Sequence, residues 1–204
     1  MKLKSLFGAG VLLAAFTAGA AGAYTLQQDK AAKDAKHDPA MEKMMEMGKP
    51  GAAHKVLEPH VGKWTLKMKC HMEPGAPPME SAATSEVKWI MDGRYIQEEV
   101  TGTFMDMPFK GQGLCGYDNL KQKYVSSWVD NMSTGIMQSE GAHDPAAKSF
   151  TYETECPDPM SGKYVKGRMV VKWTDNDHYT MQMFGPGPDG KEGMQMELLA
   201  TRAK

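Results

Sequence analysis

The sequence predicts an all-β protein, an antiparallel up-and-down β-barrel of about ten strands preceded by a short N-terminal helix. Three observations support this fold class. Short strand-type runs recur at regular spacing, a turn signal stands in nearly every gap between them, and no helical pattern separates them. An antiparallel sheet of this length usually closes into a barrel, because closure removes its unpaired edges.

Residues 1–23 have the pattern of a cleavable export signal. Two lysines precede an apolar stretch, 6–20, and a triplet of small residues ends at Ala23. The apolar stretch is shorter than the roughly 20 residues needed to span a bilayer. We therefore expect cleavage after Ala23, export to the periplasm or beyond, and no stable membrane anchor afterwards.

Residues 24–51 are rich in Lys, Asp, Ala, Gln and Met and contain no β-branched run. This composition predicts a disordered Met- and Lys-rich linker with one nascent helical turn at 41–47. The whole chain has 24 basic and 25 acidic residues, and cleavage removes two lysines. A mature chain so nearly balanced in charge argues against a nucleic-acid partner or an anionic membrane surface.

The predicted barrel domain, 52–204, begins with a short helix, Ala52–Glu58, that ends at Pro59. We expect Val56 and Leu57 on this helix to close one end of the barrel.

The strands follow in order along the rest of the chain. In the first, apolar side chains at the even positions of 64–70 alternate with Lys and Thr, so one face lies on the core and the other in water. Turn signals such as Asp92-Gly93 and Asp175-Asn176 separate the later runs. Those runs are 84–91, 94–103, 109–117, 123–130, 134–142, 149–156, 164–173, 178–184 and 194–201.

The chain has three cysteines, and an oxidising compartment would favour one disulfide among them. If the strands alternate in direction, Cys70 and Cys156 fall at the same end of the barrel and Cys115 lies nearer the other end. We expect a Cys70–Cys156 disulfide with Cys115 free. No Cys-x-x-Cys spacing occurs, which argues against a thioredoxin-like or structural zinc site.

The strand pair around the turn 131–133 carries polar and aromatic side chains on one face. A hairpin closed by that turn would place Ser126 opposite Gln138 and Tyr124 opposite Glu140. If this face is the lumen, its side chains can orient a small ligand. If it is the outer face, it is solvated sheet, and strand parity alone leaves both interpretations open.

No motif for an enzyme is found in the sequence. There is no Gly-x-Ser-x-Gly elbow, phosphate loop or His-Glu-x-x-His. Asp130 and Glu140 could be taken for an acid/base pair, but Asp130 adjoins a turn and is expected to cap it.

Methionine is the outlier of the composition, at 19 of 204 residues. Met68, Cys70, His71 and Met72 gather at the end of the first strand, and thioether, thiolate and imidazole ligands suit Cu(I). Alternation places His71 on the face opposite Met68 and Cys70, and a disulfide would occupy the Cys70 sulfur. The alternative is that these methionines are adaptable apolar side chains of the core or oxidisable surface residues.

Gly62-Lys63-Trp64 resembles the Gly-x-Trp of lipocalins, in which the Trp closes the barrel floor near a late basic residue, here Arg202. A longer set of motifs is similar in order and spacing to the bacterial domain-of-unknown-function family 1579, over about residues 52–202. Those motifs are His54–Leu57, Gly62-x-Trp64, Asp92-Gly93-Arg94-Tyr95, Phe109-x-Gly111, Gly116-Tyr117-Asp118-Asn119, Trp128-x-Asp130, Ser139-Glu140-Gly141, Asp189-Gly190-Lys191-Glu192 and Thr201-Arg202. The resemblance implies a calycin-like barrel and no established activity.

Asp92 departs from this resemblance, since a Gly is expected at its place in the turn. Asp tolerates the left-handed conformation, so we expect the turn to persist.

We therefore expect a non-catalytic protein that binds a small apolar or amphipathic ligand in its lumen. The residues expected to bind are Trp64, Trp89, Tyr117, Trp128, Gln138, Glu140 and Arg202. Two alternatives stay open, a Cu(I)- or haem-handling protein and an envelope protein that acts through its outer surface. No cofactor is assigned.

The haem alternative follows from the resemblance, because some calycin-like barrels bind haem through a histidine. The candidates flank the helix or the turns, where a surface position is the usual one. They are His54, His60, His71, His143 and His178.

Overall fold

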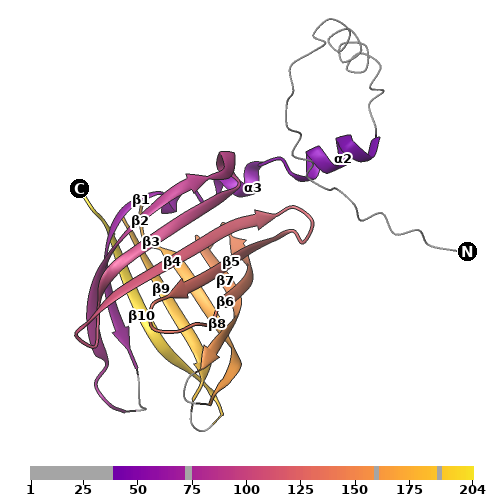
Figure 1. The fold of residues 1–204 in the computed structure, drawn as a ribbon. Coiled ribbons are helices and arrows are strands. Elements are labelled where there is room, and N and C mark those ends of the chain that lie inside the picture. Colours follow the sequence, from indigo (N-terminus) through magenta and orange to yellow (C-terminus); the bar gives the residue numbers. More distant parts are fainter. Residues whose placement is uncertain (1–38, 72–74, 159–160, 188–189) are drawn as a thin grey trace, which may run out of the picture. The chain divides into compact units, whose positions relative to one another are not determined.

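The structure is a computed structural model that describes residues 39–71, 75–158, 161–187 and 190–204. The predicted export signal, the first part of the predicted linker and Met72 lie outside these ranges. The strands form one antiparallel sheet in which β1 pairs with both β2 and β10, so the sheet closes into a ten-stranded barrel (Figure 1). This confirms the predicted fold class.

Each predicted run overlaps one strand of the barrel. The strands are β1 (Gly62–Cys70), β2 (Met79–Ile90), β3 (Tyr95–Phe104), β4 (Met107–Asp118), β5 (Lys123–Asp130), β6 (Met137–Asp144), β7 (Ser149–Asp158), β8 (Lys163–Trp173), β9 (His178–Pro186) and β10 (Glu192–Arg202). The largest difference is that β2 begins at Met79 rather than Thr84. Residues 79–83 lack a clear apolar alternation, but their backbone pairs with β1, and this pairing overrides local propensity.

The predicted register between β5 and β6 is wrong by one residue. Ser126 lies opposite Ser139 and Tyr124 lies opposite Gly141. The chain begins to turn at 131–132, but β6 does not start there, because Asn131 stays bound to β4: its side chain accepts the Lys110 N–H at 2.8 Å and donates to the Pro108 carbonyl at 2.8 Å. The connection therefore runs to residue 136, and the shift by one residue moves Gln138 and Glu140 to the outer face.

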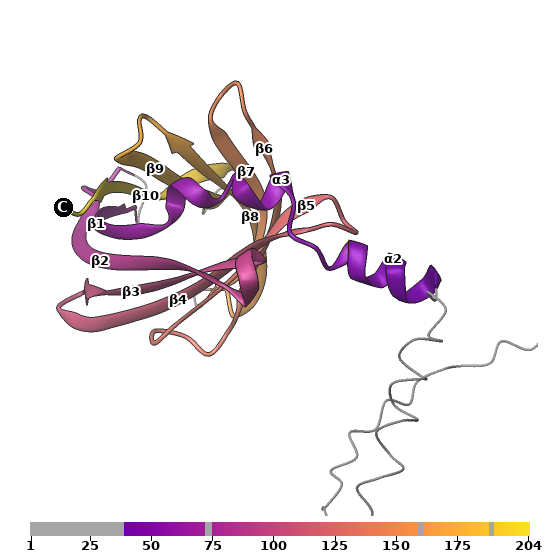
Figure 2. The ribbon, with the colours of Figure 1, turned by 90° about the horizontal axis from the view of Figure 1, so that it is seen from above.

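The predicted helix at 52–58 is present as two short pieces, α3 (Ala52–Lys55) and the 3-10 helix η1 (Glu58–His60). Pro59 lies in the first turn of η1, where its missing N–H costs no hydrogen bond. Leu57, between them, is fully buried, and Val56 packs against the core. The segment lies across one end of the barrel, as predicted, and the Tyr124 hydroxyl donates to the Ala53 carbonyl at 2.9 Å (Figure 2).

Helix α2 (Pro39–Met47) falls in the segment predicted to be a disordered linker with a helical turn at 41–47. Its side chains are exposed, so packing does not explain it. Ala, Met, Glu and Lys all favour helix, and Pro39 stands at its first position. In the described ranges, no helix is long and apolar enough to cross a membrane.

The closed end of the barrel is filled by aromatic side chains around Trp64, which is 1% exposed. Its ring meets Trp173 and Tyr179 edge-on, with centroids 5.7 and 5.0 Å away. The Trp64 Nε1 donates to the His60 carbonyl at 2.8 Å, which ties β1 to η1.

Arg202, at the end of β10, covers this floor from outside. Its guanidinium lies 4.2 Å from the centre of the Trp64 ring and donates to the carbonyls of Val61 and Pro59, each at 2.9 Å. Gly62 adopts φ 132°, which residues with a side chain rarely adopt, and a Cβ there would also lie 2.7 Å from the Arg202 Nη1, so both the backbone and the guanidinium favour glycine at this position. The predicted pairing of Gly-x-Trp with a late arginine is confirmed.

The Asp92 turn also behaves as predicted. Asp92 adopts φ 55° and ψ 42° in the short 3-10 turn η2 (Met91–Gly93), within the left-handed region that Asp tolerates.

We expect Arg202→Met to lower the free energy of unfolding by about 2–4 kcal/mol, because it removes the cation–π contact and the donors to two carbonyls. Arg202→Lys should recover only part of the loss, since one ammonium cannot reach both carbonyls over the ring. Urea denaturation followed by tryptophan fluorescence measures both changes.

The control is Arg168→Met, because Arg168 also lies over an aromatic ring, that of Phe184, but on the outer surface beside Glu192. It should cost markedly less than Arg202→Met. Equal losses from the two variants would contradict the special role of the floor.

Candidate ligand-binding lumen

The barrel contains a cavity of about 500 Å³. Leu57 and His60 border it at the closed end, and Met132, Ser133 and Pro157 border it at the other end, which we call the mouth. The cavity therefore extends from the inner side of the aromatic floor, where Tyr179 also borders it, to the mouth.

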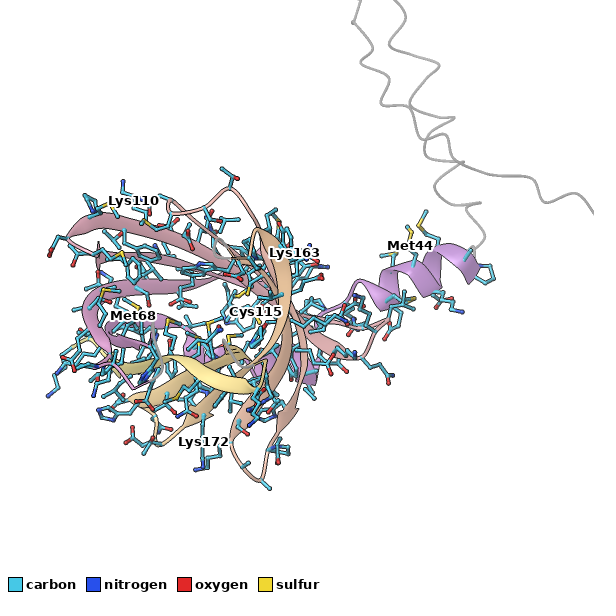
Figure 3. All side chains as sticks on the ribbon, turned by 90° about the horizontal axis from the view of Figure 1, so that it is seen from below. Met44, Met68, Lys110, Cys115, Lys163 and Lys172 are labelled. Carbon is cyan, nitrogen blue, oxygen red and sulfur yellow. The ribbon has the colours of Figure 1, made fainter. Side chains whose placement is uncertain are left out.

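Sulfur-containing side chains line much of this cavity. Figure 3, viewed from the mouth side, shows Met68 and Cys115 within the barrel, while the labelled lysines lie around its outside. The sulfur-containing residues that border the cavity are Met68, Cys70, Cys115, Met132, Met137, Cys156, Met169, Met181, Met183 and Met196.

Four of these residues form one continuous row across the sheet. Cys70 on β1 lies opposite Met196 on β10, Met196 lies opposite Met183 on β9, and Met183 lies opposite Met169 on β8. Residues directly opposite on antiparallel strands share a face, with Cβ atoms about 4.5–5.5 Å apart. We call this set, Cys70, Met196, Met183 and Met169, the sulfur row.

Among the predicted ligand-binding residues, Trp128 borders the cavity. Its ring lies flat on β4, where Gly111 and Gly113 carry no side chain: a Cβ on Gly111 would collide with the ring, and one on Gly113 would lie 3.3 Å from its Cε3. The Trp128 Nε1 donates to the Asp130 carboxylate at 2.9 Å. Asp130 also accepts the Met132 N–H at 2.9 Å, which confirms its predicted role as a turn cap.

Trp64, Trp89, Tyr117 and Arg202 lie at the closed end instead and do not border the cavity. The Trp89 Nε1 donates to the Glu58 carboxylate at 2.7 Å, and Tyr117 packs edge-on against Tyr124. These side chains hold the segment 52–60, which we call the plug, on the end of the barrel.

Gln138 and Glu140, the remaining two predicted residues, lie on the outer face. Glu140 forms ion pairs with Lys121 and Lys123 there. The register shift between β5 and β6 accounts for both placements.

Glu98 is a lumen residue that the sequence did not single out. It borders the cavity from β3, and burial raises the pKa of its carboxyl, an effect that the nearby Ser85 hydroxyl opposes in part. Cys115 lies close by, with its sulfur 3.8 Å from the Tyr152 hydroxyl, and burial raises the pKa of this thiol to about 11. The alternation along β3 was the available signal for Glu98. This residue stands at the same parity as the buried Ile96 and Val100, whereas the next residue, Glu99, is exposed.

The prediction that the histidines lie on the surface is wrong for His54 and His60. His54 is 4% exposed, and the His60 ring packs edge-on against Phe150 and Trp173 at centroid distances of 5.4 and 4.9 Å. The His60 Nδ1 lies 3.3 Å from the Leu57 carbonyl, and burial lowers the pKa of His60 to about 4. The available signal was the position of His60 between Leu57, which was expected to close the barrel end, and the strand that begins before Trp64.

All three cysteines are free in the structure, so the predicted Cys70–Cys156 disulfide is not formed in it. The two residues do lie toward the same end, on β1 and β7, but these strands are four steps apart around the barrel. Neighbouring strands are about 4.8 Å apart, whereas a disulfide needs Cα atoms within about 7 Å. Equal height on a barrel therefore did not imply contact.

The structure divides the predicted Cu(I) group. Met68 and Cys70 face the lumen, His71 follows the end of β1 with its backbone N–H bound to the Gln195 carbonyl at 2.8 Å, and Met72 lies outside the described residues. No cluster of three or more His, Cys, Asp or Glu side chains suited to a metal occurs among the residues that the structure describes.

The fold and the cavity define the class of this protein, a closed ten-stranded antiparallel β-barrel with a largely apolar lumen. Within that class, the chain belongs to the family described as "Protein of unknown function (DUF1579)", which matches residues 49–202. This confirms the resemblance noted from the sequence motifs. No curated protein matches the chain.

Solved structures are similar at low sequence identity. Rv2717c from M. tuberculosis has a TM-score of 0.55 and 10% identity, over 76% of this chain and 100% of that one, which supports the barrel fold. A redesigned β-barrel, b11L5F_LGL, has a TM-score of 0.39 and 13% identity, over 74% of this chain and 96% of that one. The redesigned barrel mFAP1, bound to DFHBI, has a TM-score of 0.36 and 14% identity, over 74% of this chain and 100% of that one.

We expect the stability of the barrel to fall as the pH is lowered from 6.5 to 4, in part because of His60. Its pKa is about 4 in the folded state against an ordinary value of 6.5, so the unfolded chain binds more protons in that window. The contribution is up to about 3 kcal/mol.

Urea denaturation at a series of pH values tests this expectation. The free energy of unfolding of a His60→Gln variant should decline less steeply with falling pH than that of the wild type, whatever the absolute stabilities. Parallel pH profiles would show that the His60 ring does not have the buried environment described above.

Proposed function

We propose that the protein is an exported, non-catalytic binding protein that holds a small apolar or amphipathic molecule in its lumen. The observation that carries this proposal is the cavity of about 500 Å³ inside a closed barrel, bordered mainly by apolar and thioether side chains. Small-molecule sites typically have volumes of about 300–1,000 Å³ and a similar apolar lining with few polar groups.

The unequal filling of the two halves of the barrel supports this proposal. Trp64, Phe150, Trp173 and Tyr179 occupy the closed half, each buried. The half toward the mouth is lined by flexible methionines, which adapt to ligands of different shape. A barrel that served only as a scaffold would gain stability from large side chains in both halves.

We expect the lumen to bind the neutral probe N-phenyl-1-naphthylamine and a Ser126→Phe variant to bind it at least about tenfold more weakly, because the new ring occupies the cavity. Val129→Phe is the matched control, since Val129 lies on the same strand but is 39% exposed on the outside. Probe fluorescence measures both affinities, and circular dichroism confirms the fold.

Equal affinity of the two variants, or no binding by the wild type, would contradict a ligand site in the lumen. Native mass spectrometry of protein purified from its own compartment would then identify any natural ligand as an adduct that is lost on denaturation.

The sulfur row favours a second candidate function, the binding of a soft metal ion such as Cu(I). Thioether and thiolate sulfur are the donors that Cu(I) prefers, and Cys70, Met196 and Met183 are direct cross-strand neighbours. These residues replace His71 and Met72 as the expected partners of Met68 and Cys70.

For this candidate, the variant Met183→Leu/Met196→Leu should lower the affinity for Cu(I) at least about tenfold, since it removes two thioethers at nearly constant volume. Met194→Leu, on the outer face, is the control. Competition with a chromophoric Cu(I) chelator under reducing conditions gives the affinities. Identical values for the three proteins would reject the sulfur row as a metal site, and a Soret band in the purified protein would indicate haem instead.

A further inference from the structure

One row of the lumen places a carboxylate next to an aromatic ring. Glu98 on β3 lies opposite Gly113 on β4, and Gly113 lies opposite Trp128 on β5, so all three share the inner face. A Cβ added to Gly113 would lie 3.7 Å from the Glu98 Cβ and 3.3 Å from the Trp128 Cε3. The glycine therefore leaves the carboxylate side chain and the ring as close neighbours with no side chain between them.

The Trp128 ring borders the cavity, and the Phe109 ring lies nearly parallel to it with a centroid distance of 6.5 Å. One face rests on the backbone of β4 at Gly111 and Gly113, and the residue borders the cavity with its other side. Its Nε1–H is already bound to the Asp130 carboxylate at 2.9 Å, which leaves the π face as the remaining binding surface. The face of an indole ring is the best aromatic partner for a cation.

The charges around this row are of one sign. Glu98 and Asp130 border the cavity, and among the described residues that border it there is no lysine or arginine. Burying a carboxylate without a cation is costly, and the raised pKa of Glu98 reflects this cost. The Ser85 hydroxyl, the Cys115 thiol and the Tyr179 hydroxyl interact with Glu98, and none of them supplies a positive charge.

We infer that the ligand of the lumen carries an ammonium group, held between the Glu98 carboxylate and the face of the Trp128 ring. The methionine-lined remainder of the cavity takes the hydrocarbon body of the ligand, so the ligand class is a hydrophobic amine. An alkyl carboxylate of the same length is disfavoured by two carboxylates of like charge. This inference rests on the proposed ligand-binding function and names its ligand class.

The test compares three decyl compounds as competitors of N-phenyl-1-naphthylamine at neutral pH. Decylamine should displace the probe at concentrations about tenfold lower than decanol, and decanoate should be the weakest, because only the amine gains the ion pair and the cation–π contact. Decyltrimethylammonium, which stays charged at every pH, should also compete better than decanol.

Two variants locate the amine site. Glu98→Gln keeps the size of the side chain and should make decylamine and decanol equally effective. Glu99→Gln, the exposed neighbour on the same strand, should leave the preference for the amine unchanged. Trp128→Leu should reduce that preference several-fold, and it provides a second readout in case Glu98→Gln does not fold.

The outcomes separate this inference from the proposed function. If decanol displaces the probe as well as decylamine does from the wild type, the lumen binds ligands but the ammonium inference is overturned. If the preference survives in Glu98→Gln, the amine is held elsewhere and the assignment to Glu98 is wrong. If no decyl compound displaces a bound probe, the ammonium inference fails, while the proposed function is still decided by the comparison of Ser126→Phe with Val129→Phe.

Discussion

The pairing of β1 with β10 is the contact on which the rest of this structure depends. It joins the first strand of the barrel to the last, and without it both would be open edges with unpaired backbone groups. Arg202 reinforces this strand pairing at the closed end of the barrel, where it lies on Trp64 and donates hydrogen bonds to the carbonyls of Val61 and Pro59. The Gly-x-Trp motif and the late arginine therefore act together to close the barrel.

That closure also determines where a ligand site can lie. The plug and the aromatic floor complete one end of the barrel, so the cavity can open only at the other end, the mouth. Methionines, rather than larger aromatic side chains, line the cavity toward the mouth. They leave open space and still present an apolar surface to it. Glu98 and Trp128 lie at the edge of this space, on the strands opposite the sulfur row.

Regular features of the sequence predicted the fold well. The in/out alternation of the first strand and the turn signals between runs indicated all ten strands and their order, and the motif around Trp64 indicated the floor. Contacts between strands were harder to predict. The attachment of Asn131 to β4 lengthened a loop and turned Gln138 and Glu140 outward, and the curvature of the barrel separated Cys70 from Cys156. The candidate site was therefore only partly predicted: Trp128 was identified, whereas Glu98 and His60 depended on burial that a pattern of residue types does not reveal.

The seam between the first and last strands also has a consequence for folding. Trp64 and Arg202 are direct partners although nearly the whole barrel sequence separates them. Hairpins between consecutive strands can form while the chain is being made, but the barrel cannot close before its last strand is present. Such a long-range contact slows folding, and until it forms β1 is an unpaired edge through which two chains can associate. The last few residues thus determine when the protein becomes a closed and non-aggregating molecule.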